Sequence, residues 1–159
     1  MSVEPIRRSV KVECGPEEAF RLFTEGMGEW WPIETHSRAA TEHEGEGVKA
    51  ERIEFQARAG GQILEHLSSG EVLAWADVLS WEPPHRFVVA WKPHSRPQPP
   101  TEVEVTFAAK EGGTIVELEH RGWERLTEDF AELYHSYAGG WIETLGRFAT
   151  AAGESETQR

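Results

Sequence analysis

Aromatic residues with polar tips, together with one histidine, are the side chains of this sequence best suited to hold a small molecule. Tyr134, Tyr137 and Trp141 follow one another at helical spacing, and His120 stands just before an Arg-Gly-Trp tripeptide. Small-ligand pockets need apolar walls with a few polar tips, because the walls supply transfer free energy and the tips fix orientation. The same residues also suit an ordinary core, and a lone histidine on an apolar strand face is more often a hydrogen-bonded core group.

The common catalytic signatures are missing from the sequence. It has no Gly-x-Ser-x-Gly elbow, no phosphate-cradling glycine loop and no His-Glu-x-x-His helix. Glu54, Glu65 and Asp77 would serve as general acid or base only if buried, and outward-facing strand charges are commoner. His36 and His43 lie in a polar loop without the regular spacing that holds a metal. We therefore expect no catalytic residue, no metal and no cofactor, although catalysis by a cavity residue stays open.

Length and charge limit the classes of partner. The chain has 159 residues, which suits one domain, expected over 1–152 with a polar tail over 153–159. Its net charge of -12, from 28 acidic against 16 basic residues, repels nucleic acid and anionic membranes. No apolar run is long enough for a membrane span or a signal core, so we expect a cytoplasmic protein. A single cysteine, Cys14, excludes an internal disulfide.

Hydrophobic periodicity predicts an α+β protein. An alternating strand over 6–14 precedes a short helix over 15–25, a second helical turn over 27–31 and a polar loop. Strand-like runs then cover 48–57, 61–67, 71–81, 86–91, 102–109 and 114–120, and a helix is expected to start at Thr127 or Glu128. Most connections between the strand-like runs are too short for parallel crossovers, so they predict a curled antiparallel meander.

The faces of these elements can be read only in part. Val103, Val105 and Phe107 alternate with charged or polar residues, as do Val116, Leu118 and His120, so one face of the sheet should be wet. Trp75 and Asp77 are expected to share a face, opposite Ala74, Ala76 and Val78. Which face points inward stays open, because a bulge can reset the alternation. Trp30 and Trp31 are not expected to point inward together from one helical turn.

The last predicted helix carries an apolar stripe and two adjacent glycines. Steps of three and four residues place one set of side chains on a single side: Phe130, Tyr134, Tyr137, Trp141, Leu145, Phe148 and Ala152. Gly139 should face solvent and permit a slight bend, whereas Gly140 at the edge of the stripe would let another element approach closely. A helix broken at this pair is the alternative.

The order of these elements, with the segments EWWP, VLSWEPPHRFVVAW, GGTIVELEHRGW and YAGGWIETLGRF, resembles the START-like superfamily. Specifically, it is similar to bacterial proteins named after the C-terminal domain of the activator of Hsp90 ATPase. The resemblance implies a helix-grip fold, in which a bent antiparallel sheet of about six or seven strands wraps a long C-terminal helix and leaves a cavity. Two short helices would follow the first strand, and Gly140 and Trp141 match the family's Gly-Trp pair.

The cavity implied by this resemblance gives the functional hypotheses. The residues expected to line it are Trp31, Trp75, Trp91, Phe107, His120, Tyr134, Tyr137 and Trp141. The leading hypothesis is a binding protein for a small apolar or aromatic molecule. One alternative is a partner of a chaperone, and another is a cyclase-like enzyme using His120 or Tyr137 as proton donor. The chain is expected to be a monomer or a homodimer.

Overall fold

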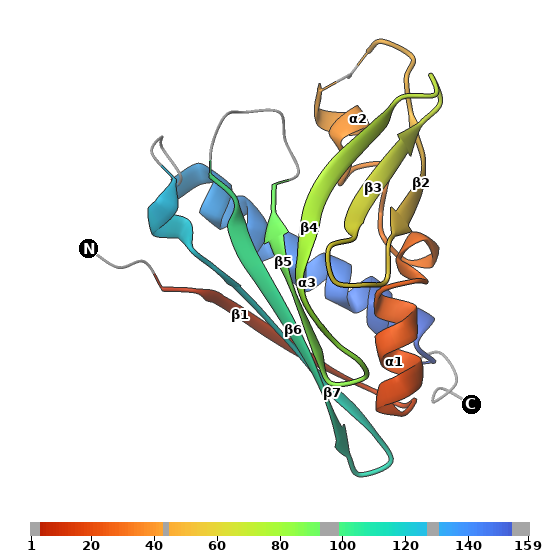
Figure 1. Cartoon of the computed structure of the whole chain (residues 1–159), viewed down its shortest axis with the longest axis vertical. Coiled ribbons are helices and arrows are strands. Elements are labelled where there is room, and N and C mark those ends of the chain that lie inside the picture. The colour runs from red at the N-terminus through yellow and green to blue at the C-terminus, as the bar shows by residue number, and fades with distance from the viewer. Residues whose placement is uncertain (1–3, 43–44, 93–98, 127–130, 154–159) are drawn as a thin grey trace.

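The computed structural model describes residues 4–42, 45–92, 99–126 and 131–153. It contains one antiparallel seven-stranded sheet and a long C-terminal helix (Figure 1). The order along the chain is β1 (Ile6–Val12), α1 (Pro16–Phe23), the 3₁₀ turn η1 (Met27–Glu29), α2 (Arg38–Glu42), β2 (Ala50–Phe55), β3 (Gln62–Leu67), β4 (Val72–Glu82), β5 (Arg86–Trp91), β6 (Thr101–Lys110), β7 (Gly113–Arg121), the 3₁₀ turn η2 (Trp123–Arg125) and α3 (Ala131–Ala151).

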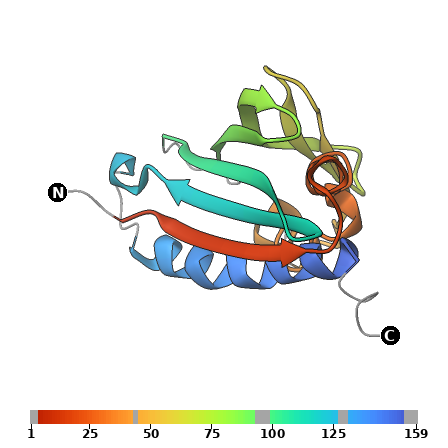
Figure 2. The ribbon, with the colours of Figure 1, turned by 90° about the horizontal axis from the view of Figure 1, so that it is seen from below.

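The sheet is a six-stranded meander to which the first strand is added at one edge. Strands β2 to β7 pair with their sequence neighbours, and β1 pairs with β7 at the edge, giving the order β1-β7-β6-β5-β4-β3-β2. The sheet curls over α3, which runs alongside β1 (Figure 2). The predicted α+β helix-grip fold is therefore confirmed, including the short helical elements that follow the first strand. No helix among the described residues is long and apolar enough to span a membrane.

Alternation along β6 and β7 builds much of the inner face. Val103, Val105 and Phe107 are buried on β6, and the residues between them are only partly covered. Since successive side chains of a strand point to opposite faces, this pattern turns the apolar set toward α3 and the acidic set toward solvent. The predicted wet face is thus present.

The apolar stripe of α3 follows the predicted helical spacing. Trp141, Leu145, Phe148 and Ala152 are buried, while Tyr134 and Tyr137 are half-buried. The helix is continuous through Gly139 and Gly140, so the predicted stripe is confirmed over these residues and the alternative of a broken helix is not observed. Phe130 and the expected start at Thr127 or Glu128 lie outside the described residues.

The explanation offered for Gly140 is wrong. A Cβ atom built at Gly140 would meet only the ring of His36, at 3.8 Å, which is an ordinary contact. Gly139 faces solvent as expected, and a Cβ atom there would meet nothing within 4 Å. Neither position therefore needs a glycine to make room for another element.

The predicted pairing of Trp75 with Asp77 on one face is also wrong. Ile63 of β3 pairs with Ala76 of β4, but Leu64 pairs with Ala74, so Trp75 is the extra residue of a bulge. The bulge resets the alternation. Trp75 is consequently buried with Ala76 and Val78, and Asp77 is exposed.

Trp30 and Trp31 both point into the core, contrary to expectation. Only Met27–Glu29 forms the 3₁₀ turn, and Trp30 is its C-cap, with φ -129°. Trp30 packs on Phe148 at 5.3 Å between ring centroids and Trp31 packs on Trp75 at 5.2 Å, while the two indoles contact each other at 5.8 Å. Both are buried. The elements α2 and η2 lie in segments for which the sequence predicted no helix.

Candidate functional site

Seven of the eight predicted site residues come together in one group of touching rings, which we call the polar aromatic cluster. Neighbouring ring centroids in it lie 4.3 to 6.4 Å apart. Its members come from strands β4, β5 and β7, from helix α3, from η2 and from the residues just after η1. They are Trp31, Trp75, Trp91, His120, Trp123, Tyr134, Tyr137 and Trp141. Trp123 was not predicted, because it follows the last strand in a turn with no periodicity to place it.

Phe107, the eighth predicted residue, lies in a different part of the core. Its ring contacts Phe20 at 5.0 Å, Phe23 at 5.8 Å and Phe87 at 6.3 Å. In the register of β6 and β7, Val103 pairs with His120, so Phe107 stands four residues farther along β6. That separation is about 13 Å at the rise of a strand, which explains why a shared face did not bring Phe107 to the cluster.

His120 is fully buried and hydrogen-bonded at both ring nitrogens. The indole N–H of Trp141 donates to its Nδ1 at 3.0 Å, so the ring proton resides on Nε2, which donates to Thr101 Oγ1 at 2.7 Å. The Thr101 hydroxyl is in turn 3.4 Å from the carbonyl oxygen of Trp91. Burial lowers the pKa of His120 to about 3. The imidazole is therefore neutral at pH 7 and has no nitrogen left for a substrate.

Tyr137 holds the other polar atom at the centre of the cluster. Its hydroxyl oxygen accepts a hydrogen bond from the indole N–H of Trp91 at 3.0 Å. Among the described residues, no acceptor stands within hydrogen-bonding distance of its hydroxyl hydrogen. Burial raises the pKa of Tyr137, and the bond from Trp91 offsets this only in part. The hydroxyl is a protonated donor near the half-buried edge of the cluster.

Glu65 is a buried carboxylate beneath Trp75. It is 0% exposed, and its oxygens accept bonds from the Trp75 indole N–H at 2.7 Å and the backbone N–H groups of Arg38 and Ala39 at 2.7 and 2.9 Å. These bonds tie the first turn of α2 to the cluster. The sequence held a signal for this burial, because Glu65 alternates with Ile63 and Leu67 on β3.

The segment between Trp31 and α2 lies over the middle of α3. The indole N–H of Trp31 donates to the carbonyl oxygen of His36 at 2.7 Å, and the His36 ring faces Gly140. At the other end of the cluster, the Tyr134 hydroxyl donates to the carbonyl oxygen of Glu4 at 2.9 Å. Of the two remaining carboxylates proposed as acid or base, Glu54 bonds to His66 Nε2 at 2.8 Å and Asp77 accepts from Gln62. Both are on the outer face.

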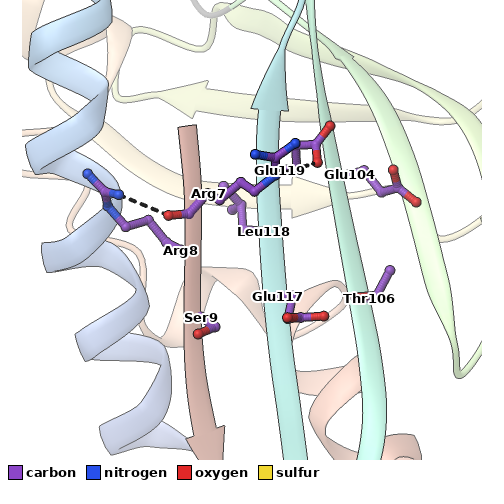
Figure 3. Close-up of a pocket in the computed structure, with 8 residues that line it drawn as sticks. All are labelled: Arg7, Arg8, Ser9, Glu104, Thr106, Glu117, Leu118 and Glu119. Carbon is purple, nitrogen blue, oxygen red and sulfur yellow. Dashed lines mark hydrogen bonds and ion pairs between the residues drawn. The ribbon is translucent and has the colours of Figure 1, made fainter. Parts of the chain in front are cut away.

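Among the grooves lined by described residues, two are well formed, and neither of these two touches the polar aromatic cluster. One, of about 360 Å³, lies on the charged outer face of β1, β7 and β6, where Glu119 and Glu104 lie across from Arg7 and Glu117 lies across from Ser9 (Figure 3). The other, of about 420 Å³, lies between α1 and the turn from β4 to β5. Within the described ranges, no three histidine, cysteine or acidic side chains are grouped to hold a metal ion, and His43 is outside them.

Comparison with known proteins supports the resemblance found in the sequence. A family model described as activator of Hsp90 ATPase homolog 1-like protein matches residues 13–153. No curated protein matches the chain.

Solved structures with this fold cover nearly the whole chain. Protein CV1439 from Chromobacterium violaceum is 20% identical, with a TM-score of 0.65 over 94% of this chain and 96% of its own. The Aha1 dimer from Colwellia psychrerythraea is 16% identical, with a TM-score of 0.64 over 94% and 96%. Txn09, an anthrahydroquino-γ-pyrone synthase complexed with SUM, is 26% identical, with a TM-score of 0.58 over 94% and 97%. The first two comparisons concern the fold alone.

Proposed function

The chain belongs to the family of activator of Hsp90 ATPase homolog 1-like proteins, and from this premise we propose that it binds a small apolar or aromatic molecule between the sheet and α3. The site is the polar aromatic cluster. The family's fold is compatible with a ligand-binding protein of this kind. The identity of the guest follows from the chemistry of the cluster, which offers flat aromatic faces and very few free polar atoms.

The observation that carries the proposal is the unused hydroxyl hydrogen of Tyr137. The ring nitrogens of His120 and the indole N–H groups of Trp91 and Trp141 already have partners. A donor left without an acceptor in an apolar setting costs about 1 to 3 kcal/mol, and an acceptor on a guest would recover this free energy. The guest is therefore a planar apolar molecule with one hydrogen-bond acceptor, such as an aromatic carbonyl compound.

Entry takes place at the tyrosine edge of the cluster. Tyr134 and Tyr137 are half-buried, whereas the tryptophans and His120 are buried. Because the rings touch one another, a guest is accommodated when the tyrosines move apart from Trp123 and Trp91. Among the described residues, two of the contacts that would be broken are hydrogen bonds, those of Trp91 to Tyr137 and of Tyr134 to Glu4.

The experiment is a titration with a panel of planar aromatic compounds, followed by tryptophan fluorescence and by the melting temperature. At least one carbonyl-bearing member should change the fluorescence saturably and raise the melting temperature. Tyr137→Phe should weaken this binding about two- to tenfold, since one hydrogen bond contributes roughly 0.5 to 1.5 kcal/mol. Tyr134→Phe separates the two hydroxyls, because it removes the bond to Glu4 that opens on entry and should therefore not weaken binding. A panel without any response would refute the proposal.

The family description favours one second candidate, an action on a chaperone ATPase. That description names an activator of Hsp90 ATPase, and one structural neighbour is an Aha1 dimer. The purified protein would then stimulate the ATPase rate of a bacterial Hsp90 in a coupled assay. An unchanged rate at a tenfold excess of this protein would remove the candidate. Catalysis by His120 is disfavoured, because both of its ring nitrogens are occupied.

A further inference from the structure

Trp81 differs from the other tryptophans in the state of its indole N–H. All seven tryptophans lie in the described ranges, and six of them donate this hydrogen to a protein acceptor. No acceptor among the described residues stands within hydrogen-bonding distance of the Trp81 indole, which is half-buried on β4. A buried indole N–H usually finds a partner within the protein, whereas the half-buried Trp81 indole keeps its N–H available to an acceptor on a bound molecule.

Trp81 lines the groove of about 420 Å³ between α1 and the turn from β4 to β5. Its ring packs edge to face against Phe20 of α1 at 5.0 Å, and Pro83 and Pro84 form the wall beyond it. None of the residues lining this groove belongs to the polar aromatic cluster. The apolar floor is therefore a separate surface, made of aromatic rings and proline rings.

Charged side chains of α1 and its end form the rim. Glu17, Arg21 and Glu25 are spaced four residues apart, all are exposed, and none has an ion pair with a described residue. The groove in Figure 3 is different, because its Glu119 pairs with Arg7 at 3.2 Å, and Arg121 also contacts Glu119. The two carboxylates of the α1 rim are thus available to a cationic partner.

We propose that this groove binds an extended, proline-containing protein segment that carries lysine or arginine. A polyproline II segment has no internal hydrogen bonds, so its carbonyl oxygens are free to accept from the Trp81 indole. Aromatic-lined grooves recognise such segments by packing proline rings against aromatic faces. A basic side chain of the segment would lie beside Glu17 or Glu25, on the side away from Arg21.

The charges argue against other occupants. A small apolar guest would gain nothing from two unpaired carboxylates at the rim. A second copy of this chain, with a net charge of -12, would be repelled by them at moderate ionic strength. A basic segment would accept the hydrogen bond of the Trp81 indole through a carbonyl oxygen and would pair its positive charge with the carboxylates of the rim.

The test follows the indole N–H resonances of ¹⁵N-labelled protein during titration with synthetic peptides. The first probe is an acetylated octapeptide of six prolines and two arginines, and Trp81→Phe assigns the Trp81 resonance. We expect a saturable shift of this resonance, with the Trp91 and Trp141 resonances unchanged. The same peptide with glutamate in place of arginine, or glycine in place of proline, should bind at least about fivefold more weakly.

A charge-reversed variant separates recognition from folding. Glu17→Lys with Glu25→Lys changes two exposed side chains and should weaken the arginine peptide about tenfold, while Glu117→Lys on β7 should leave it unchanged. The proposal is overturned if the Trp81 resonance does not move at millimolar peptide, or if the glutamate peptide binds as tightly. It is also overturned if the resonance moves with protein concentration alone, or responds to a small aromatic compound and not to the peptide.

Discussion

The core of this protein has two aromatic regions built on opposite principles. The polar aromatic cluster near the start of α3 consists of tryptophan, histidine and tyrosine, and two of its hydrogen bonds join strands to the helix. Toward the other end of α3, a phenylalanine cluster made of Phe20, Phe23, Phe87, Phe107 and Phe148 has ring centroids 4.9 to 6.3 Å apart and no polar ring atom. Trp30 and Trp31 join the two regions at 5.8 Å.

The difference separates stability from recognition. Phenylalanine rings need no hydrogen-bond partner, so their region can be close-packed, and its main effect is to increase the free energy of unfolding. Polar ring atoms must be paired when buried, so their region fixes a specific geometry and leaves a single donor, the Tyr137 hydroxyl, for a guest. Variants of the phenylalanine cluster should therefore change stability, and variants of the polar aromatic cluster should change pH dependence and binding.

The largest effect is expected from Phe148→Ala in the phenylalanine cluster. Phe148 is 0% exposed, and truncation of a buried phenylalanine costs about 3 to 5 kcal/mol through lost transfer free energy and a cavity. Urea unfolding measures this loss. Binding of an aromatic carbonyl compound should stay within about twofold when measured well below the lowered melting temperature, and a larger change would show that the two regions are not separate.

Glu65→Gln should come next, with a loss of about 1 to 3 kcal/mol. The glutamine amide would present N–H to donors that now bond to a carboxylate oxygen, so one of the bonds from Trp75, Arg38 and Ala39 must be lost. Amide hydrogen exchange should accelerate at Arg38 and Ala39 in this variant. Unchanged exchange there would mean that Glu65 does not hold α2 in place.

The pH dependence of unfolding should report His120. Its folded pKa of about 3 lies below the ordinary value of 6.5, so the unfolded chain binds the proton more readily between these pH values. The stability contributed by neutral His120 is present above pH 6.5 and is lost as the pH falls. At pH 5 the loss relative to pH 8 is about 2 kcal/mol. In His120→Gln this part of the pH dependence should vanish, and an unchanged profile would contradict the neutral assignment.

The smallest effect should be a gain from Gly139→Ala. Alanine in an exposed helix interior is about 1 kcal/mol more favourable than glycine, and the new Cβ meets nothing within 4 Å. Thermal unfolding should therefore show a higher melting temperature. A lower one would indicate that this position needs glycine for a reason that the described residues do not contain.

The fold could be predicted from the sequence because its signals are local. The turns AGG, SSG, EPPH and KEGG separate apolar runs, and β5 was predicted over 86–91 as observed. The stripe from Tyr134 to Ala152 needed only helical spacing. By contrast, the short helix α2 depends on hydrogen bonds to Glu65 from a distant strand, and no local pattern shows them.

The sequence predicted most of the residues of the candidate site, but it predicted their positions and contacts less well. Seven predicted residues do meet, because each is a large aromatic or histidine side chain on an inner face or next to one. Phe107 was misplaced, because the sequence gives the face of a strand and not the position along it. The direction of Trp75 depended on a bulge, and the bonds of His120 depended on the register that brings Thr101 beside it.

The most direct measurement is a titration of ¹⁵N-labelled protein with a planar aromatic carbonyl compound, observed at the indole N–H resonances. Trp91 donates to the Tyr137 hydroxyl, so its resonance should shift saturably, together with that of Trp141. The Trp81 resonance, outside the polar aromatic cluster, should stay in place. If no compound in the panel shifts Trp91, or if Trp81 alone responds, the small-molecule site between the sheet and α3 is contradicted.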